Sequence, residues 1–320
     1  MAAAPTLGSA VRRAALLAAL VLGWGGAARA AVQVLIVSGL GGEPAYEERF
    51  DALGRDMAKA SVSVAGDAEH VHRVAGAQAT AAGVEGAITQ LAAALRPGDQ
   101  AIIVFIGHGS YDGTEYRLNL PGPDLTGTRL AALLDRLPAS CPQLVVNTTS
   151  ASGAITRLWQ RPYRLVITAT KSAGERNATR LAQYWAQALT SIEADRDKDE
   201  VVTAAEAFDY ASRQVADSFK ADAVVATEHA VLAGAEPSRF VVARLGRGAR
   251  FAGDAQLQSL HGEQSGVEER LAALKARKAS LAPDRYYEEL EPVLRELALL
   301  DRRVDAREQQ LSASGTGGTK

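Results

Sequence analysis

The sequence predicts an α/β fold with a mostly parallel sheet, and three observations support this. Short apolar runs rich in β-branched residues alternate along the chain with segments of helical spacing, as in βα units. Several runs are apolar at nearly every position, which is typical of strands buried on both faces. Two runs end in small polar segments, residues 107–110 and 147–153. Because ligands bind at the carboxyl edge of such sheets, these ends predict the functional site.

The first thirty residues have the features of a secretory signal peptide. Arg12 and Arg13 form a positive region, residues 14–24 are apolar, and Ala-Arg-Ala at 28–30 is a small-x-small cleavage signal. We expect cleavage before Ala31 and a periplasmic or secreted protein; an uncleaved N-terminal anchor is the alternative. No later segment approaches the run of about 18 apolar residues that a membrane helix needs.

The net charge and the cysteine content argue against a nucleic-acid-binding protein and against a fold held together by disulfides. Loss of the signal would lower the net charge from −2 to −5, because it removes three arginines and no acidic residue. This acidic net charge argues against a surface that binds nucleic acid. The single cysteine, Cys141, cannot form an intramolecular disulfide. No cofactor is expected to be required.

The first half of the expected α/β domain, which spans residues 31–250, contains three strands. Pro44 is suited to the first turn of a helix. His70 and His72 would share one face of a strand; this face is interpreted as solvent-exposed, with a metal pair as the alternative. The expected elements are strand 32–37, helix 44–60, strand 70–74, helix 81–95, strand 100–106 and a hairpin arm at 116–120.

The second half of the domain continues the alternation. Asp124 or Thr126 can cap a helix that runs to about residue 136. The expected elements after it are strands 143–146 and 164–170 and helices 177–189 and 203–221.

The character of the chain changes after Gly253. Residues 267–281 and 284–311 are rich in Leu, Ala, Glu, Lys and Arg at helical spacing, and Pro283 separates them. We expect an antiparallel helical hairpin within residues 254–311. It is interpreted as a packing appendage, with a coiled-coil partner or self-association as the alternative. The tail, residues 312–320, is expected to be disordered.

An acidic segment has the spacing of a calcium-binding loop of the EF-hand type. Oxygen donors fall at loop positions 1, 3, 5, 7, 9 and 12, and position 6, where the motif has glycine, is Glu200. The sequence therefore predicts weak Ca²⁺ binding; the alternative is a solvated loop in which a capping box starts the next helix. The predicted ligands are Asp195, Asp197, Asp199, the carbonyl of Val201, Thr203 and Glu206.

Residues 32–232 resemble the caspase-like cysteine peptidases, and most closely the legumain (asparaginyl endopeptidase) group. Phe-Ile-Gly-His-Gly-Ser at 105–110 is similar to the legumain histidine segment, and the 42-residue gap from His108 to Ser150 is of the size that these peptidases use. Residues 166–179 are similar to the strand and loop that contribute to the legumain specificity pocket. The resemblance implies a caspase-like three-layer sandwich, to which the C-terminal helical hairpin is added.

The sequence departs from the family at the nucleophile. The legumain pattern Ala-Cys-x-Ser-Gly aligns with residues 149–153, so Ser150 stands at the cysteine position. Cys141 lies before the strand and is not expected to replace it. The resemblance implies His108 as the base, the amide of Gly109 as an oxyanion donor, and charged groups for a polar specificity pocket. The candidates for that pocket are Lys171, Glu175 and Arg176.

Three functions follow from these residues. The preferred one is an exported legumain- or caspase-like peptidase homologue, catalytically impaired, that binds peptides or proteins. A serine hydroxyl needs a base held by a third group, and the sequence offers only Asp112 and Glu115 near His108. The alternatives are an active hydrolase of peptide bonds that uses Ser150 and His108, and an envelope scaffold that assembles through the C-terminal helices.

Overall fold

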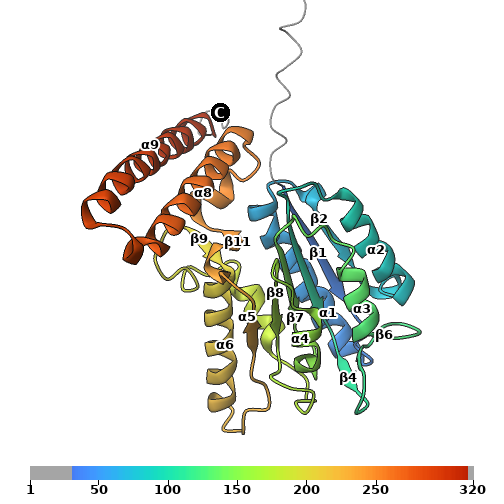
Figure 1. The fold of residues 1–320 in the computed structure, drawn as a ribbon. Coiled ribbons are helices and arrows are strands. Elements are labelled where there is room, and N and C mark those ends of the chain that lie inside the picture. The colour runs from blue at the N-terminus through green and yellow to red at the C-terminus, as the bar shows by residue number, and fades with distance from the viewer. Residues whose placement is uncertain (1–30, 316–320) are drawn as a thin grey trace, which may run out of the picture.

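The computed structural model describes residues 31–315 (Figure 1). The expected signal peptide and residues 316–320 lie outside this range. Within it, no helix is both long enough and apolar enough to cross a membrane.

The body of the molecule is built on a six-stranded sheet with the strand order β10-β8-β7-β3-β1-β2. Five strands are parallel, and only β10, at one edge, is antiparallel to its neighbour β8. The predicted α/β fold with a mostly parallel sheet is therefore confirmed. The strands are β1 (Val32–Ser38), β2 (Val71–Val74), β3 (Gln100–Ile106), β7 (Gln143–Asn147), β8 (Arg164–Thr168) and β10 (Val231–Ala233).

Helices cover both faces of this sheet, because alternate residues of each central strand point to opposite sides. Val34 and Ile36 of β1 belong to one buried cluster, whereas Leu35 and Val37 belong to the other. The first cluster lies under α1 (Pro44–Ala65), α5 (Leu181–Ala188) and α6 (Ala204–Ala221). The second lies under α2 (Ala81–Ala94), α3 (Gly127–Leu134) and α4 (Thr156–Trp159).

Two small antiparallel sheets extend the body. One follows the histidine segment and consists of β4 (Gly109–Tyr111), β5 (Tyr116–Leu118) and β6 (Leu125–Thr126). The other pairs β9 (Val201–Thr203) with β11 (Val241–Arg244), which α7 (Gly246–Arg250) follows. Of these strands, the sequence predicted only the arm at 116–120, because runs of two to four residues carry little periodicity.

Two predicted elements in the body are wrong at their ends. His70 lies in a 3₁₀ turn, Ala68–His70, with its Nδ1 3.3 Å from the carbonyl oxygen of Ala65. The strand begins after it, so His70 and His72 do not share a strand face. The helix expected from residue 177 begins at Leu181, because the Glu228 carboxylate accepts the amides of Arg180 and Leu181 there.

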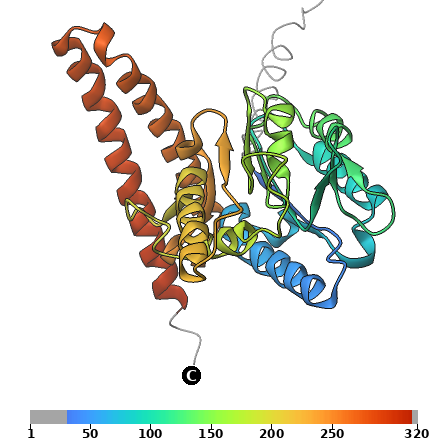
Figure 2. The same ribbon diagram turned by 90° about the horizontal axis from the view of Figure 1, so that it is seen from below.

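The C-terminal helices α8 (Ala255–Ala276) and α9 (Pro283–Gly315) form a hairpin that lies along one side of the molecule (Figure 2). Asp254 caps α8 by accepting the Leu257 amide, so α8 starts about three turns before the expected residue 267. Ion pairs Asp254–Arg307 and Arg277–Glu289 join opposite ends of the two helices, which sets them antiparallel. Residues 312–315, expected to be disordered, continue α9.

Candidate functional site

His108 and Ser150 lie beyond the carboxyl ends of neighbouring parallel strands. Phe105 of β3 is in register with Asn147 of β7. His108 and Ser150 each follow their strand's paired residue by three positions. The structure thus places both predicted residues at the edge of the sheet where α/β proteins bind ligands.

Gly109 holds these two segments in contact. A Cβ atom at this position would lie 2.4 Å from the carbonyl oxygen of Ser150 and 2.6 Å from Oγ1 of Thr149. It would also lie 2.7 Å from a ring carbon of Tyr116. Only glycine fits here, because the backbone of the histidine segment approaches that of the serine segment so closely.

The His108 imidazole is held by groups that carry no charge. Its ring meets Tyr46 and Phe50 of α1 edge-on, with ring centroids 4.7 and 5.1 Å away. The carbonyl of Gly41 accepts a hydrogen bond from the ring. Burial lowers the pKa of His108 below its ordinary value, although Gly41 and the nearby acids Glu43 and Glu47 oppose this shift. The imidazole is therefore neutral at neutral pH.

The two carboxylates near His108 in sequence serve other groups. Asp112 accepts the amides of Thr114 and Glu115 and pairs with Arg117 at 2.9 Å. Glu115 accepts the amide and the hydroxyl of Thr128. Within residues 31–315, no carboxylate is hydrogen-bonded to the His108 ring, and the ring is not hydrogen-bonded to Ser150.

A buried hydrogen-bond network fixes the segment that carries Ser150. The side-chain oxygen of Asn147 accepts the amide and the hydroxyl of Thr149, at 3.1 and 2.8 Å. Tyr116 from β5 contacts the Thr149 hydroxyl at 2.6 Å and accepts from the Asn147 amide group at 3.1 Å. Burial raises the pKa of Tyr116 to about 12, so its hydroxyl stays protonated. Ser150 itself is only 3% exposed.

The loop after β8 packs against the residues that follow Ser150. Ala151 has a φ of 55°, a conformation that costs energy for any residue with a side chain, and its amide donates to the carbonyl of Glu175 at 2.8 Å. This places Glu175 and Lys171, two of the predicted binding residues, beside the candidate site. Arg176, the third, is exposed, and its Nε donates to the carbonyl of Ala173 in its own loop.

His229 is a residue of this edge that the sequence did not predict. It lies two residues before β10, and its Nδ1 is 2.5 Å from Oε1 of Glu175. Burial raises the pKa of Glu175, but hydrogen bonds from the Lys171 amide and from His229 outweigh it and leave the pKa below its ordinary value. An imidazole–carboxylate pair is therefore present, formed by His229 and not by His108.

Cys141 is remote from this chemistry. It is buried before β7 begins, at the opposite end of that strand from Ser150, and its Sγ donates to the carbonyl of Arg96 at 3.0 Å. Burial raises the pKa of its thiol. Cys141 therefore has the properties of a structural cysteine.

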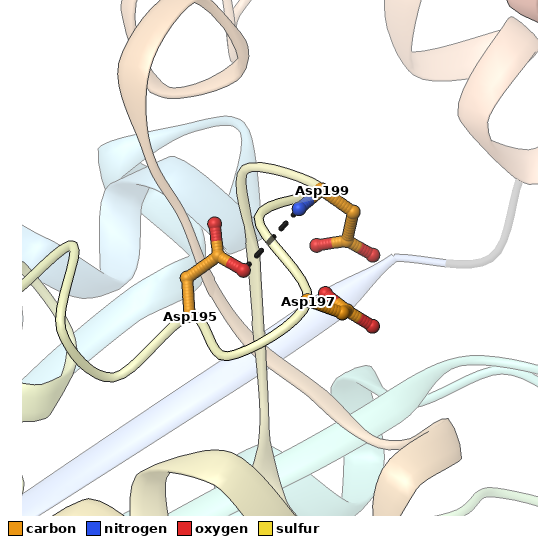
Figure 3. Close-up of side chains that lie close together, drawn as sticks. All are labelled: Asp195, Asp197 and Asp199. Carbon is orange, nitrogen blue, oxygen red and sulfur yellow. Dashed lines mark hydrogen bonds between the residues drawn. The ribbon is translucent and has the colours of Figure 1, made fainter.

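The acidic loop between α5 and α6 brings three predicted calcium ligands together (Figure 3). One carboxylate oxygen from each of Asp195, Asp197 and Asp199 lies within 4.8 Å of the others. Burial, followed by repulsion from these neighbours, raises the pKa of Asp199 to about 6. Glu200 has a φ of 64°, the left-handed conformation for which the motif uses glycine.

Two of the remaining predicted calcium ligands cap the start of α6. Thr203 and Glu206 form a capping box, the alternative that the sequence offered. Glu206 accepts from the Thr203 amide and hydroxyl with one oxygen and from the Arg196 amide with the other. Val201 belongs to β9. Asp195 is engaged as well, because its two oxygens accept the amides of Lys198, Asp199 and Glu200. Calcium binding at this loop stays a prediction.

No family model and no curated protein matches this chain. Among solved structures, it is similar to a structural-genomics target from Geobacter sulfurreducens, with 15% identity and a TM-score of 0.42 over 67% of this chain and 97% of that one. It is also similar to caspase-1 from Spodoptera frugiperda, with 12% identity and a TM-score of 0.45 over 64% of this chain and 87% of that one. At these identities the similarity concerns the fold alone.

Proposed function

We propose that this chain is an exported caspase- or legumain-like peptidase homologue that binds a peptide or protein and is catalytically impaired. One observation carries the proposal. His108 and Ser150 lie at neighbouring strand ends and Gly109 joins their segments, whereas the carboxylate–imidazole pair at this edge belongs to His229.

The chemistry of oxygen and sulfur explains why this arrangement favours binding over hydrolysis. A thiol has a pKa of about 8.5 and ionises readily beside an imidazole. A serine hydroxyl needs a base whose orientation and charge a third group stabilises. The His108 ring donates a hydrogen bond to the Gly41 carbonyl. A carbonyl carries no negative charge, so it cannot neutralise an imidazolium as a carboxylate does.

The charged groups beside Ser150 support recognition of a polar ligand. Lys171 forms an ion pair with Glu175, and His229 contacts the same carboxylate through its Nδ1. About half of each of the Lys171 and His229 side chains is exposed. Such a cluster, fixed to the backbone of the serine segment through Ala151, can select a polar side chain of an extended peptide.

The test introduces the missing thiol. The variant Ser150→Cys is prepared in a Cys141→Ala background, so that it carries one cysteine, and is treated with peptide chloromethyl ketones that differ in their terminal side chain. We expect covalent labelling, measured by mass spectrometry, that falls at least tenfold when His108→Ala is added. The matched control is the parent chain with only Cys141, whose thiol should not react because it lies at the opposite end of β7 from His108 and donates to the Arg96 carbonyl.

Two results would contradict the proposal in different ways. Absence of labelling in a folded Ser150→Cys variant would mean that no peptide-binding cleft exists at this edge. Peptide hydrolysis by the native chain, abolished by both His108→Ala and Ser150→Ala, would mean that Ser150 is an active nucleophile and that the chain is not impaired.

A further inference from the structure

The hairpin carries a groove of about 720 Å³ between α8 and α9, beside its own core. Its apolar lining includes Leu299, which is 53% exposed, and Ala306, whereas Leu300 points inward and is buried. The hairpin's own core is small and consists of Leu257, Leu260, Val267, Leu300 and Val304. Charged side chains from both helices also line the groove. The hairpin therefore has a groove with a mixed apolar and charged lining, and Leu299 in it lies outside the hairpin's own core.

Two glycines in the groove wall have no role in the isolated hairpin. Gly262 and Gly266 lie one turn apart inside α8, where each costs about 1 kcal/mol of helix stability relative to alanine. A Cβ atom at either position would meet no atom within 4 Å. Neither a tight contact nor a left-handed φ requires glycine here, so the space above them is free for a group from outside the chain.

The groove thus combines a protruding side chain, Leu299, with a recess above Gly262 and Gly266. A two-fold axis that runs along the groove would bring each Leu299 over the α8 wall of the other copy at the level of Gly266, which is the reciprocity that a symmetric dimer needs. The rims carry both signs of charge. The pair Glu263–Arg303 lies towards one end and Arg270–Glu296 towards the other, so opposed rims need not repel.

We infer that this groove is the interface with a second copy of the chain, formed by packing of the two hairpins into a four-helix bundle. Each α9 spans 33 residues, about 50 Å of helix, and offers a long surface for such packing. The inference stands on the hairpin alone and is independent of the chemistry at Ser150.

The test fills the recess without harming the fold. Gly266→Gln adds a side chain into open space and improves helix propensity, so the variant should fold to a stable monomer with native helix content while the dimer is lost. Leu299→Glu should break the same contact from the other side. Gly86→Gln is the matched control, because Gly86 lies inside α2 with equally open space above it.

Sedimentation equilibrium of the full chain from ~1 to ~100 µM, the range of ordinary interface affinities, gives the outcome. We expect twice the mass of one chain for the native protein and for Gly86→Gln, with dissociation at least tenfold weaker in both groove variants. A native chain that stays monomeric throughout overturns the inference, as does a dimer that both groove variants retain. Capture of a different protein by a monomeric chain would equally overturn it.

Discussion

Gly109 is the residue on which the geometry of the candidate site depends most directly. In Gly109→Ala the methyl group would meet the Ser150 carbonyl at 2.4 Å, so one of the two strand ends must move. Overpacking of this kind costs about 1–3 kcal/mol of unfolding free energy. We expect that loss in urea denaturation, with reduced labelling of Ser150→Cys. Gly86→Ala, in open helical space, should instead stabilise by about 0.5–1 kcal/mol; equal effects of the two changes would contradict the close contact.

The site residues that could be predicted from sequence are those that a local sequence pattern marks. His108 and Ser150 each end an apolar run, and the parallel strands then bring those ends to one edge. His229 precedes a three-residue edge strand and belongs to no motif, so its pairing with Glu175 was visible only in three dimensions. Tyr46, which packs on His108, reads in sequence as an ordinary helix residue.

Helix α5 depends on a buried carboxylate at its first turn. Glu228 is 3% exposed and accepts two amides there, yet burial raises its pKa from 4.5 to about 7. The folded state thus favours protonated Glu228. The stability that Glu228 contributes in this form is fully present below pH 4.5 and is lost as the pH rises through 7. At about 1.4 kcal/mol per pH unit, the loss is roughly 3 kcal/mol.

The variant Glu228→Gln should remove this dependence. Its unfolding free energy should lie about 1 kcal/mol below that of the native chain near pH 5, because the glutamine NH2 group cannot accept one of the two amides. Relative to the native chain it should then gain up to about 3 kcal/mol between pH 5 and pH 8, where the native carboxylate becomes charged. Comparing the two proteins at each pH cancels the titration of all other groups. The exposed Glu193→Gln serves as the control. A native chain more stable than Glu228→Gln at pH 8 would show that the amide bonds outweigh the cost of burial.

Long elements were predictable and short ones were not. The mostly apolar runs of β1 and β3 and the Pro44 start of α1 match their predicted positions within a few residues. The start of α5 is set by Glu228, 47 residues away from Leu181, and no local signal encodes it. At the acidic loop the register for calcium and the capping box for α6 use the same Thr203 and Glu206, so sequence could not decide between them.

At the scale of the whole molecule, the apolar residues separate into a body and a hairpin. The body contains the two clusters on either face of the sheet, and the hairpin's cluster shares no residue with them. Composition predicted this change after Gly253 because a Leu-, Ala- and charge-rich segment cannot form buried parallel strands. Composition could not show that the core of the body contains no residue of the hairpin, because only side-chain packing in three dimensions reveals which residues form each core.

A chain shortened to residues 31–253 should therefore fold. It loses every member of the hairpin's cluster and leaves Phe251 without the helices on which it packs, a cost of about 2 kcal/mol, comparable to exposing one large apolar side chain. Circular dichroism should show a single cooperative unfolding transition, and sedimentation should give a monomer. The Ser150→Cys form of this short chain should still react with peptide electrophiles, because all residues of the candidate site precede residue 254. If the shortened chain does not unfold cooperatively, the body needs the hairpin in order to fold, and the prediction is wrong.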